Sequence, residues 1–120
     1  MGIRAGLRIA KYWGLTDTEL GQLLGERSAR TIRRWRAILR EGVDSGLPTE
    51  DDELHDRLSL ILGIYKALHT LFSDDDQADE WIRRPNSAPV FEGQSALAMM
   101  LAGGLDSMWE VRRYLKAATS

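Results

Sequence analysis

Residues 81–115, WIRRPNSAPVFEGQSALAMMLAGGLDSMWEVRRYL, decide the fold, because they combine firm chain punctuation with a high apolar content. Proline lacks an N–H and disfavours helical backbone in the residue before it, so Pro85 ends a helix. Ser95 can cap a second helix, Gly103-Gly104 can end it, and Asp106 can cap a third. The stretch therefore predicts three short helices around a shared apolar set: Trp81, Phe91, Leu97, Met100, Leu101, Met108, Val111 and Leu115.

Length and composition restrict the class of protein. A chain of 120 residues with 43% hydrophobic residues forms one domain, or two small helical lobes, with a thin core that assembly would help to stabilise. It has no cysteine, which excludes disulfides and thiolate metal sites and fits a reducing compartment. Residues 1–15 lack the apolar core of a signal peptide, and no run approaches the roughly 18 apolar residues of a membrane span. We expect a cytoplasmic protein.

The small net charge of −2 conceals an uneven distribution. Residues 1–40 carry nine Lys and Arg against three acids, a net charge of +6, whereas residues 41–120 carry seven against fifteen, a net charge of −8. This division predicts a nucleic-acid contact at one end of the chain and a different partner at the other. Chance segregation of charge on solvated faces is the alternative.

The first 40 residues have the pattern of three helices. Apolar residues at helical spacing predict a helix over 1–13 that Gly14 breaks. Thr16 and Glu19 form a capping box for a helix over 17–24, which Gly25 stops. Ser28 then caps a helix that ends near Arg40. Two short helices joined by a tight glycine-containing turn are typical of a helix-turn-helix, although the turn glycine here lies seven residues before Ile32 rather than the usual six.

The helix over 29–40 separates its apolar and basic residues by face. Its predicted buried stripe is Ala29, Ile32, Trp35 and Leu39, and Arg36 lies near that stripe as a snorkelling or paired side chain rather than a base contact. Arginines on the opposite face can contact guanine edges or phosphates in a major groove, while the alternative is a solvated basic face on an ordinary core helix. The predicted DNA-binding residues are Arg27, Ser28, Arg30, Thr31, Arg33 and Arg34.

The rest of the chain predicts an all-α protein with a helix-turn-helix lobe over 1–47 and a helical lobe over 48–120. Residues 41–48 form the linker or turn between them. The helix over 54–72 has two apolar stripes, so either it is a core helix wrapped by its own chain or one stripe serves a homodimer. Ser73 can cap the next helix, whose first turn is acidic. In the last helix, Trp109 lies off the apolar stripe beside arginines, as residues of interface hot spots do, or else it packs on a neighbouring helix.

Catalytic and metal-binding patterns are missing from the sequence. His55 and His69 lie fourteen residues apart with no acids clustered at a metal-binding spacing, and the run Asp74-Asp75-Asp76 has no EF-hand spacing. No nucleophile with a base, carboxylate pair or phosphate-binding loop is present. We therefore expect no enzyme activity, no metal and no cofactor.

Two sets of residues resemble one family, the Xre/MbcA/ParS antitoxins. The first is LLGERSARTIRRWR at 23–36. The second comprises Trp81 with Pro85-Asn86, then Gly93-Gln94-Ser95-Ala96-Leu97, and a closing Val111-Arg112-Arg113-Tyr114-Leu115. These match the family's Trp-x₃-Pro-Asn, Gly-x-Ser/Thr-x-Leu and Val-Arg-x-Tyr-Leu motifs, and the resemblance covers residues 16–116.

This resemblance implies an antitoxin of a type II toxin–antitoxin system. Such a protein covers the active site of a RES-domain toxin that depletes NAD, and it represses its own operon by binding operator DNA. The resemblance, together with the off-stripe position of Trp109, assigns toxin binding to Trp109, Arg112, Arg113, Tyr114, Lys116 and Ser120. The alternative is a helix-turn-helix transcriptional regulator whose C-terminal lobe only dimerises.

Overall fold

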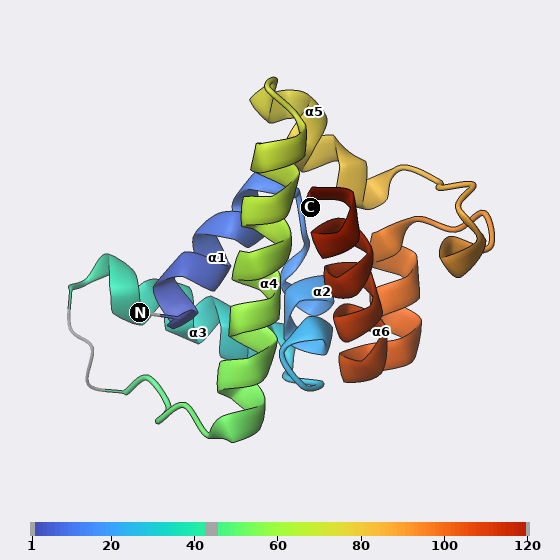
Figure 1. Cartoon of the computed structure of the whole chain (residues 1–120). Helices are drawn as coiled ribbons and strands as arrows, with labels where there is room; N and C mark the ends of the chain where they lie inside the picture. The colour runs from blue at the N-terminus through green and yellow to red at the C-terminus, as the bar shows by residue number, and fades with distance from the viewer. Residues whose placement is uncertain (1, 43–45, 120) are drawn as a thin grey trace.

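Helices account for the regular structure of the chain, which the computed structural model describes over residues 2–42 and 46–119 (Figure 1). The all-α prediction is confirmed. The elements are α1 (Gly2–Tyr12), α2 (Asp17–Leu23), α3 (Ala29–Arg40), α4 (Asp52–Leu71), α5 (Asp75–Glu80), the 3₁₀ turns η1 (Trp81–Arg83) and η2 (Pro89–Phe91), and α6 (Ala96–Thr119).

Helix α4 packs against both the first and the last helix of the chain. It contacts α1 and α6, and it lies between them in the view of Figure 1. Both predicted stripes therefore pack within the chain. Within α4, which the structure describes in full, Leu71 at 39% exposure is the only large apolar side chain that is exposed. The interpretation of this helix as one wrapped by its own chain is confirmed. Its buried residues are Leu54, Leu58, Leu60, Ile61, Ile64, Ala67 and Leu68.

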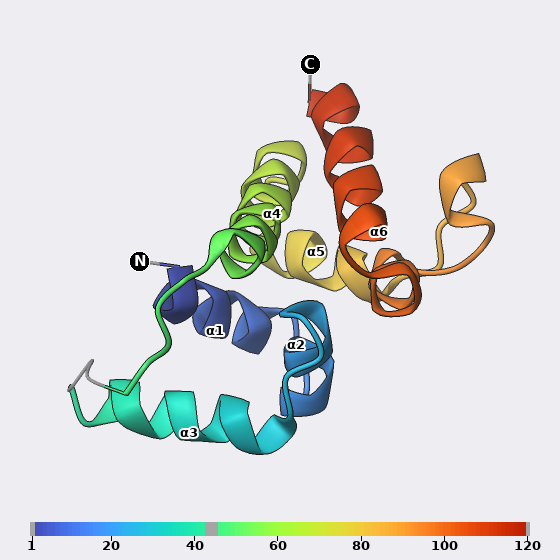
Figure 2. The same ribbon diagram turned by 90° about the horizontal axis from the view of Figure 1, so that it is seen from below.

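The N-terminal helices begin and end where the sequence predicts. Gly14 has φ +66° and follows α1, and the reciprocal capping box is formed, with the Glu19 N–H donating to Thr16 Oγ1 at 3.0 Å and the Thr16 N–H to Glu19 Oε1 at 2.9 Å. Ser28 caps α3 by accepting from the Thr31 N–H at 3.1 Å. In the view of Figure 2, α1 lies between α4 and α3, and α2 connects the ends of α1 and α3. The predicted linker lies partly outside the described residues, at 43–45.

Two details of the C-terminal half correct the sequence prediction. The cap of α5 is Asp74 rather than Ser73, because the Asp74 carboxylate accepts the Asp76 N–H at 2.9 Å. The predicted break between the last two helices is confirmed, because α6 consists of two helical arms separated by a kink at Gly104, which takes the non-helical φ +65° and ψ −142°; the cap of the second arm is not as predicted. The second arm is already helical at Leu105, so Asp106 lies in its first turn, where an acid is favourable, and not at its cap.

Candidate functional site

The C-terminal half holds a cluster of three aromatic rings from three elements. Phe91 is buried, and its ring meets Trp81 edge-on at 5.8 Å and Tyr114 edge-on at 5.0 Å, while Trp81 and Tyr114 stack at 6.4 Å. Edge-to-face and offset pairs at these separations are favourable aromatic geometries. Tyr114, a predicted toxin contact, is thus half-buried in the packing that holds η1 and η2 against α6.

The loop between η1 and α6 explains the Pro85-Asn86 and Gly93 motifs. The Asn86 N–H donates to the Gln94 carbonyl at 3.0 Å, and the Gly93 N–H donates back to the Asn86 carbonyl at 3.1 Å. Asn86 Oδ1 also accepts the Ala88 N–H at 2.9 Å, and Gly93 takes φ +84°. These bonds close the loop into a narrow hairpin-like excursion beside α6, visible at the edge of Figure 1. The motif residues therefore shape the loop.

A row of side chains points outward from the second arm of α6. Trp109 is 44% exposed, and Arg113 and Lys116 are exposed on the same side of the helix. We call Trp109, Arg113 and Lys116 the outer row. An exposed indole next to cations has the composition of an interface hot spot.

Arg112 differs from the outer row in its surroundings. It is half-buried and lies across α4 at Gly63, where a Cβ atom would come within 2.6 Å of Arg112 Nε. Its guanidinium therefore packs on the chain's own helix and reaches solvent only in part. Ser120, the last predicted toxin contact, lies outside the described residues.

The arginine face of α3 is exposed as predicted. Arg30, Arg33 and Arg34 all point to solvent, while Ile32 and Trp35 are buried beneath them and Ala29 and Leu39 are half-buried. Arg36 pairs with Asp17 across the two helices at 3.0 Å, which confirms the paired role expected for it.

The other predicted DNA-binding residues have bonds within the turn itself. Arg27 Nε donates to the Leu24 carbonyl at 3.1 Å, and its guanidinium lies 5.1 Å from the centre of the Trp35 ring. The Ser28 and Thr31 hydroxyls bond each other at 3.0 Å. These side chains shape the start of α3, and Arg30, Arg33 and Arg34 are the ones that extend beyond it.

Gly21 is a structural requirement that the sequence did not reveal. Gly25 does take a positive φ of +98°, as a turn glycine should. At Gly21, however, a Cβ atom would lie 2.0 Å from the Arg27 carbonyl oxygen, and the Arg27 N–H donates to the Gly21 carbonyl at 2.8 Å. The turn thus folds back onto α2 at the one residue without a side chain. A second glycine four residues before Gly25 was the available signal.

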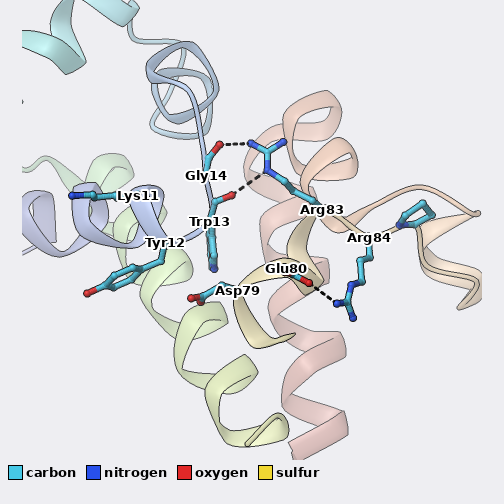
Figure 3. Close-up of a pocket in the computed structure, with 9 residues that line it drawn as sticks. Lys11, Tyr12, Trp13, Gly14, Asp79, Glu80, Arg83 and Arg84 are labelled. Carbon is cyan, nitrogen blue, oxygen red and sulfur yellow. Dashed lines mark hydrogen bonds and ion pairs between the residues drawn. The ribbon is translucent and has the colours of Figure 1, made fainter. Parts of the chain in front are cut away.

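Arg83 joins the first helices to the rest of the molecule. Its Nε donates to the Trp13 carbonyl at 3.1 Å and its Nη2 to the Gly14 carbonyl at 2.6 Å (Figure 3). Nη2 also donates to Glu19 Oε1 at 2.8 Å. Burial raises the pKa of the Glu19 carboxyl, but the Thr16 N–H and the Arg83 guanidinium outweigh it, so the pKa lies below its ordinary value. The same junction borders an open pocket of about 430 Å³.

Two further bonds cross the same boundary. Gln22 Nε2 donates to the Leu101 carbonyl at 2.9 Å, next to the bend at Gly104, and Arg57 Nη1 donates to the Leu23 carbonyl at 3.0 Å near the end of α2. Both acceptors are carbonyls close to a helix end or a break, where the intrahelical partner is missing. No sign of the roles of Arg83 and Gln22 is present in the sequence. For Arg57 the only sign was its position four residues after Glu53, with which it forms an ion pair.

The described residues hold no group of three or more His, Asp or Glu side chains arranged to bind a metal. His69 contacts Asp75 at 3.2 Å and Asp79 at 2.8 Å, which ties the end of α4 to α5. Within residues 2–42 and 46–119, no helix is both long and apolar enough to cross a membrane.

Comparisons with known proteins agree with the C-terminal geometry. Residues 67–119 match the family model described as the antitoxin Xre/MbcA/ParS C-terminal toxin-binding domain. The chain is also similar to the uncharacterized protein y4oB of Sinorhizobium fredii, with 40% identity over 115 residues that cover 96% of this chain and 81% of the relative. The matched region contains the aromatic cluster and the outer row.

Proposed function

This chain belongs to the Xre/MbcA/ParS antitoxin family and is an antitoxin with a toxin partner, and we propose that this partner is a RES-family toxin that depletes NAD. The antitoxin neutralises it by covering its active site. The observation that carries this proposal is the outer row, Trp109, Arg113 and Lys116, which lies inside the matched toxin-binding domain. A large indole that is already half-exposed gains burial when a partner covers it, without any cost of unfolding the antitoxin.

Co-expression tests the toxin half of the proposal. The product of the neighbouring open reading frame should stop growth and lower cellular NAD when it is expressed alone, and this chain should restore both. The two proteins should co-purify as a stable complex. A neighbour that is not toxic, or that fails to co-purify, would overturn the proposal.

The second half of the proposal is repression of the chain's own operon through α2 and α3. It is supported by the exposed arginine face of Arg30, Arg33 and Arg34 and by the +6 charge of residues 1–40. In a gel shift with duplex DNA spanning its own promoter, the triple alanine variant should bind more weakly. The log–log salt slope should fall by about 0.9 for each phosphate that the variant no longer neutralises. An unchanged shift would remove α3 from the DNA interface.

A homodimer is also part of the proposal. Because α4 uses both stripes inside the chain, the dimer interface would draw on other exposed apolar side chains. Among residues 2–42 and 46–119, the large ones besides Leu71 are Tyr12, Val90 and Trp109. Light scattering coupled to gel filtration measures the mass directly. A mass of one chain at micromolar concentration would contradict the dimer.

A further inference from the structure

A basic groove lies between α1 and α3, outside the recognition face assigned from the sequence. Its volume is about 560 Å³, and Leu7 and Leu39 contribute its apolar surface. Both helices contribute lining residues, and Figure 2 shows α1 and α3 facing each other. Five cations line the groove: Arg4, Arg8, Lys11, Arg36 and Arg40.

The charge of the groove is of one sign. No acidic side chain is among the described residues that line it. Arg8, Lys11 and Arg40 are exposed, and Arg36 has a carboxylate partner, Asp17, on α2. Cations gathered within a Debye length of roughly 8 Å reinforce one another's potential and favour an extended polyanion.

The groove is continuous with the arginine face of α3. At 100° per residue, Arg36 and Arg40 lie on the same flank of the helix as Arg33, which leads on to Arg30 and Arg34. The cations of α1 form a second row of positive charge beside that flank of α3. One basic surface therefore extends from the exposed side of α3 across the groove to α1.

Duplex DNA has the dimensions to contact the cations of α3 and those of α1 at once. Its major groove is about 12 Å wide and admits one helix, which is itself roughly 10–12 Å across with its side chains. A helix alongside the inserted one then lies above the phosphates that border the groove. We propose that Arg8, Lys11 and Arg40 hold the phosphate backbone of operator DNA beside α3, and that the groove positions the protein without reading bases.

This inference rests on the proposed binding of operator DNA by α3. The main test variant is Arg8→Ala/Lys11→Ala, whose two positions are exposed on α1, so that the fold should be kept. The matched control is Lys66→Ala/Arg84→Ala, which removes the same charge from exposed positions on α4 and after η1. Affinity is measured from about 50 to 200 mM salt, the range over which phosphate binding weakens steeply, for promoter duplex and for a random-sequence duplex of equal length.

With two phosphates left without a cation, the log–log salt slope should fall by about 1.8 for both duplexes. The ratio of promoter to random-sequence affinity should stay constant, whereas Arg30→Ala/Arg34→Ala should lower that ratio. The control should change neither quantity.

The outcomes separate the inference from the function on which it rests. Wild-type protein that fails to prefer its promoter duplex would overturn the proposed repression. Promoter binding that the α1 variant leaves unchanged in affinity and slope would overturn the inference alone. The same holds if this variant binds DNA normally but no longer binds the toxin, because the groove would then serve a protein partner.

Discussion

Helices α3 and α6 both present cations to solvent, but they differ in what accompanies the charge. The exposed face of α3 carries Arg30, Arg33 and Arg34 without a large exposed apolar side chain, whereas the outer row of α6 includes Trp109 at 44% exposure. Binding through charge alone weakens steeply with salt, while burial of an indole depends little on salt. The two faces are therefore suited to different partners, a polyanion and a protein.

The two regions also differ in how their geometry is maintained. The turn before α3 depends on a backbone contact at Gly21 that tolerates no side chain. The base of α6 depends on the rings of Trp81, Phe91 and Tyr114, which pack from three separate elements. A single methyl group added at Gly21 should therefore disrupt the turn before α3, whereas the base of α6 should tolerate small changes at its surface.

Gly21→Ala should have the largest effect. The new Cβ would lie 2.0 Å from the Arg27 carbonyl oxygen, and a backbone atom cannot move away without opening the turn. We expect a loss of about 3 kcal/mol or more in the free energy of unfolding, measured by urea denaturation, since overpacking against a fixed neighbour lies at the upper end of its usual cost. Promoter binding should disappear with the turn.

Gly42→Ala is the matched control for that substitution. Gly42 has φ +75°, but nothing lies within 4 Å of an added Cβ, so only the backbone conformation is penalised, by about 1 kcal/mol. Equal losses of unfolding free energy in the two variants would show that the close approach at Gly21 is no constraint.

Toxin binding should persist in Gly21→Ala under conditions where the protein stays folded.

Trp109→Ala should have the next largest effect and should act on the other face. Truncating a central hot-spot aromatic costs about 2 kcal/mol, which corresponds to roughly 30-fold in the affinity for the toxin. The weakening should be the same at low and high salt, and promoter binding should be unchanged. Calorimetric titration at two salt concentrations measures it.

Tyr12→Ala serves as the control for an exposed aromatic, because Tyr12 is 50% exposed on α1. It should leave toxin affinity within a factor of two. If Trp109→Ala binds toxin like the wild type, the contrast between a charged face and an aromatic face is wrong.

The sequence was a good guide wherever the physical cause is local. The capping box of Thr16 and Glu19, the Ser28 cap and the stop at Pro85 each follow from residues within four positions of one another. The exposed arginines of α3 and the off-stripe Trp109 followed from helical spacing alone.

Features that depend on tertiary packing could not be predicted in this way. Whether Gly21 meets a carbonyl depends on the path of the turn, and whether Arg112 reaches solvent depends on how α6 crosses α4 at Gly63. The bonds of Arg83 span about seventy residues of sequence, and a single arginine gives no sign of such partners. The basic groove was missed for the same reason, because its two walls come from helices that the sequence separates.

The smallest effect concerns Glu19, at the junction between the two regions. Its folded-state pKa lies below the ordinary value of 4.5, so its charged form stabilises the fold. That contribution is fully present above pH 4.5 and disappears as the pH falls through the folded-state pKa. Glu19→Gln should therefore cost about 0.5 kcal/mol at neutral pH and show a shallower fall in stability below pH 4.5.

Urea denaturation at a series of pH values measures this dependence, and Arg83→Ala provides the partner variant. Because the Arg83 guanidinium is one of the groups that lower the pKa of Glu19, its removal should flatten the acid dependence in the same direction. Arg83→Ala should also cost more at neutral pH than Glu19→Gln, since it gives up the bonds to the Trp13 and Gly14 carbonyls as well. If the two variants kept the wild-type pH dependence, the Glu19–Arg83 pair would not join the α3 region to the α6 region, and the two faces would be supported independently.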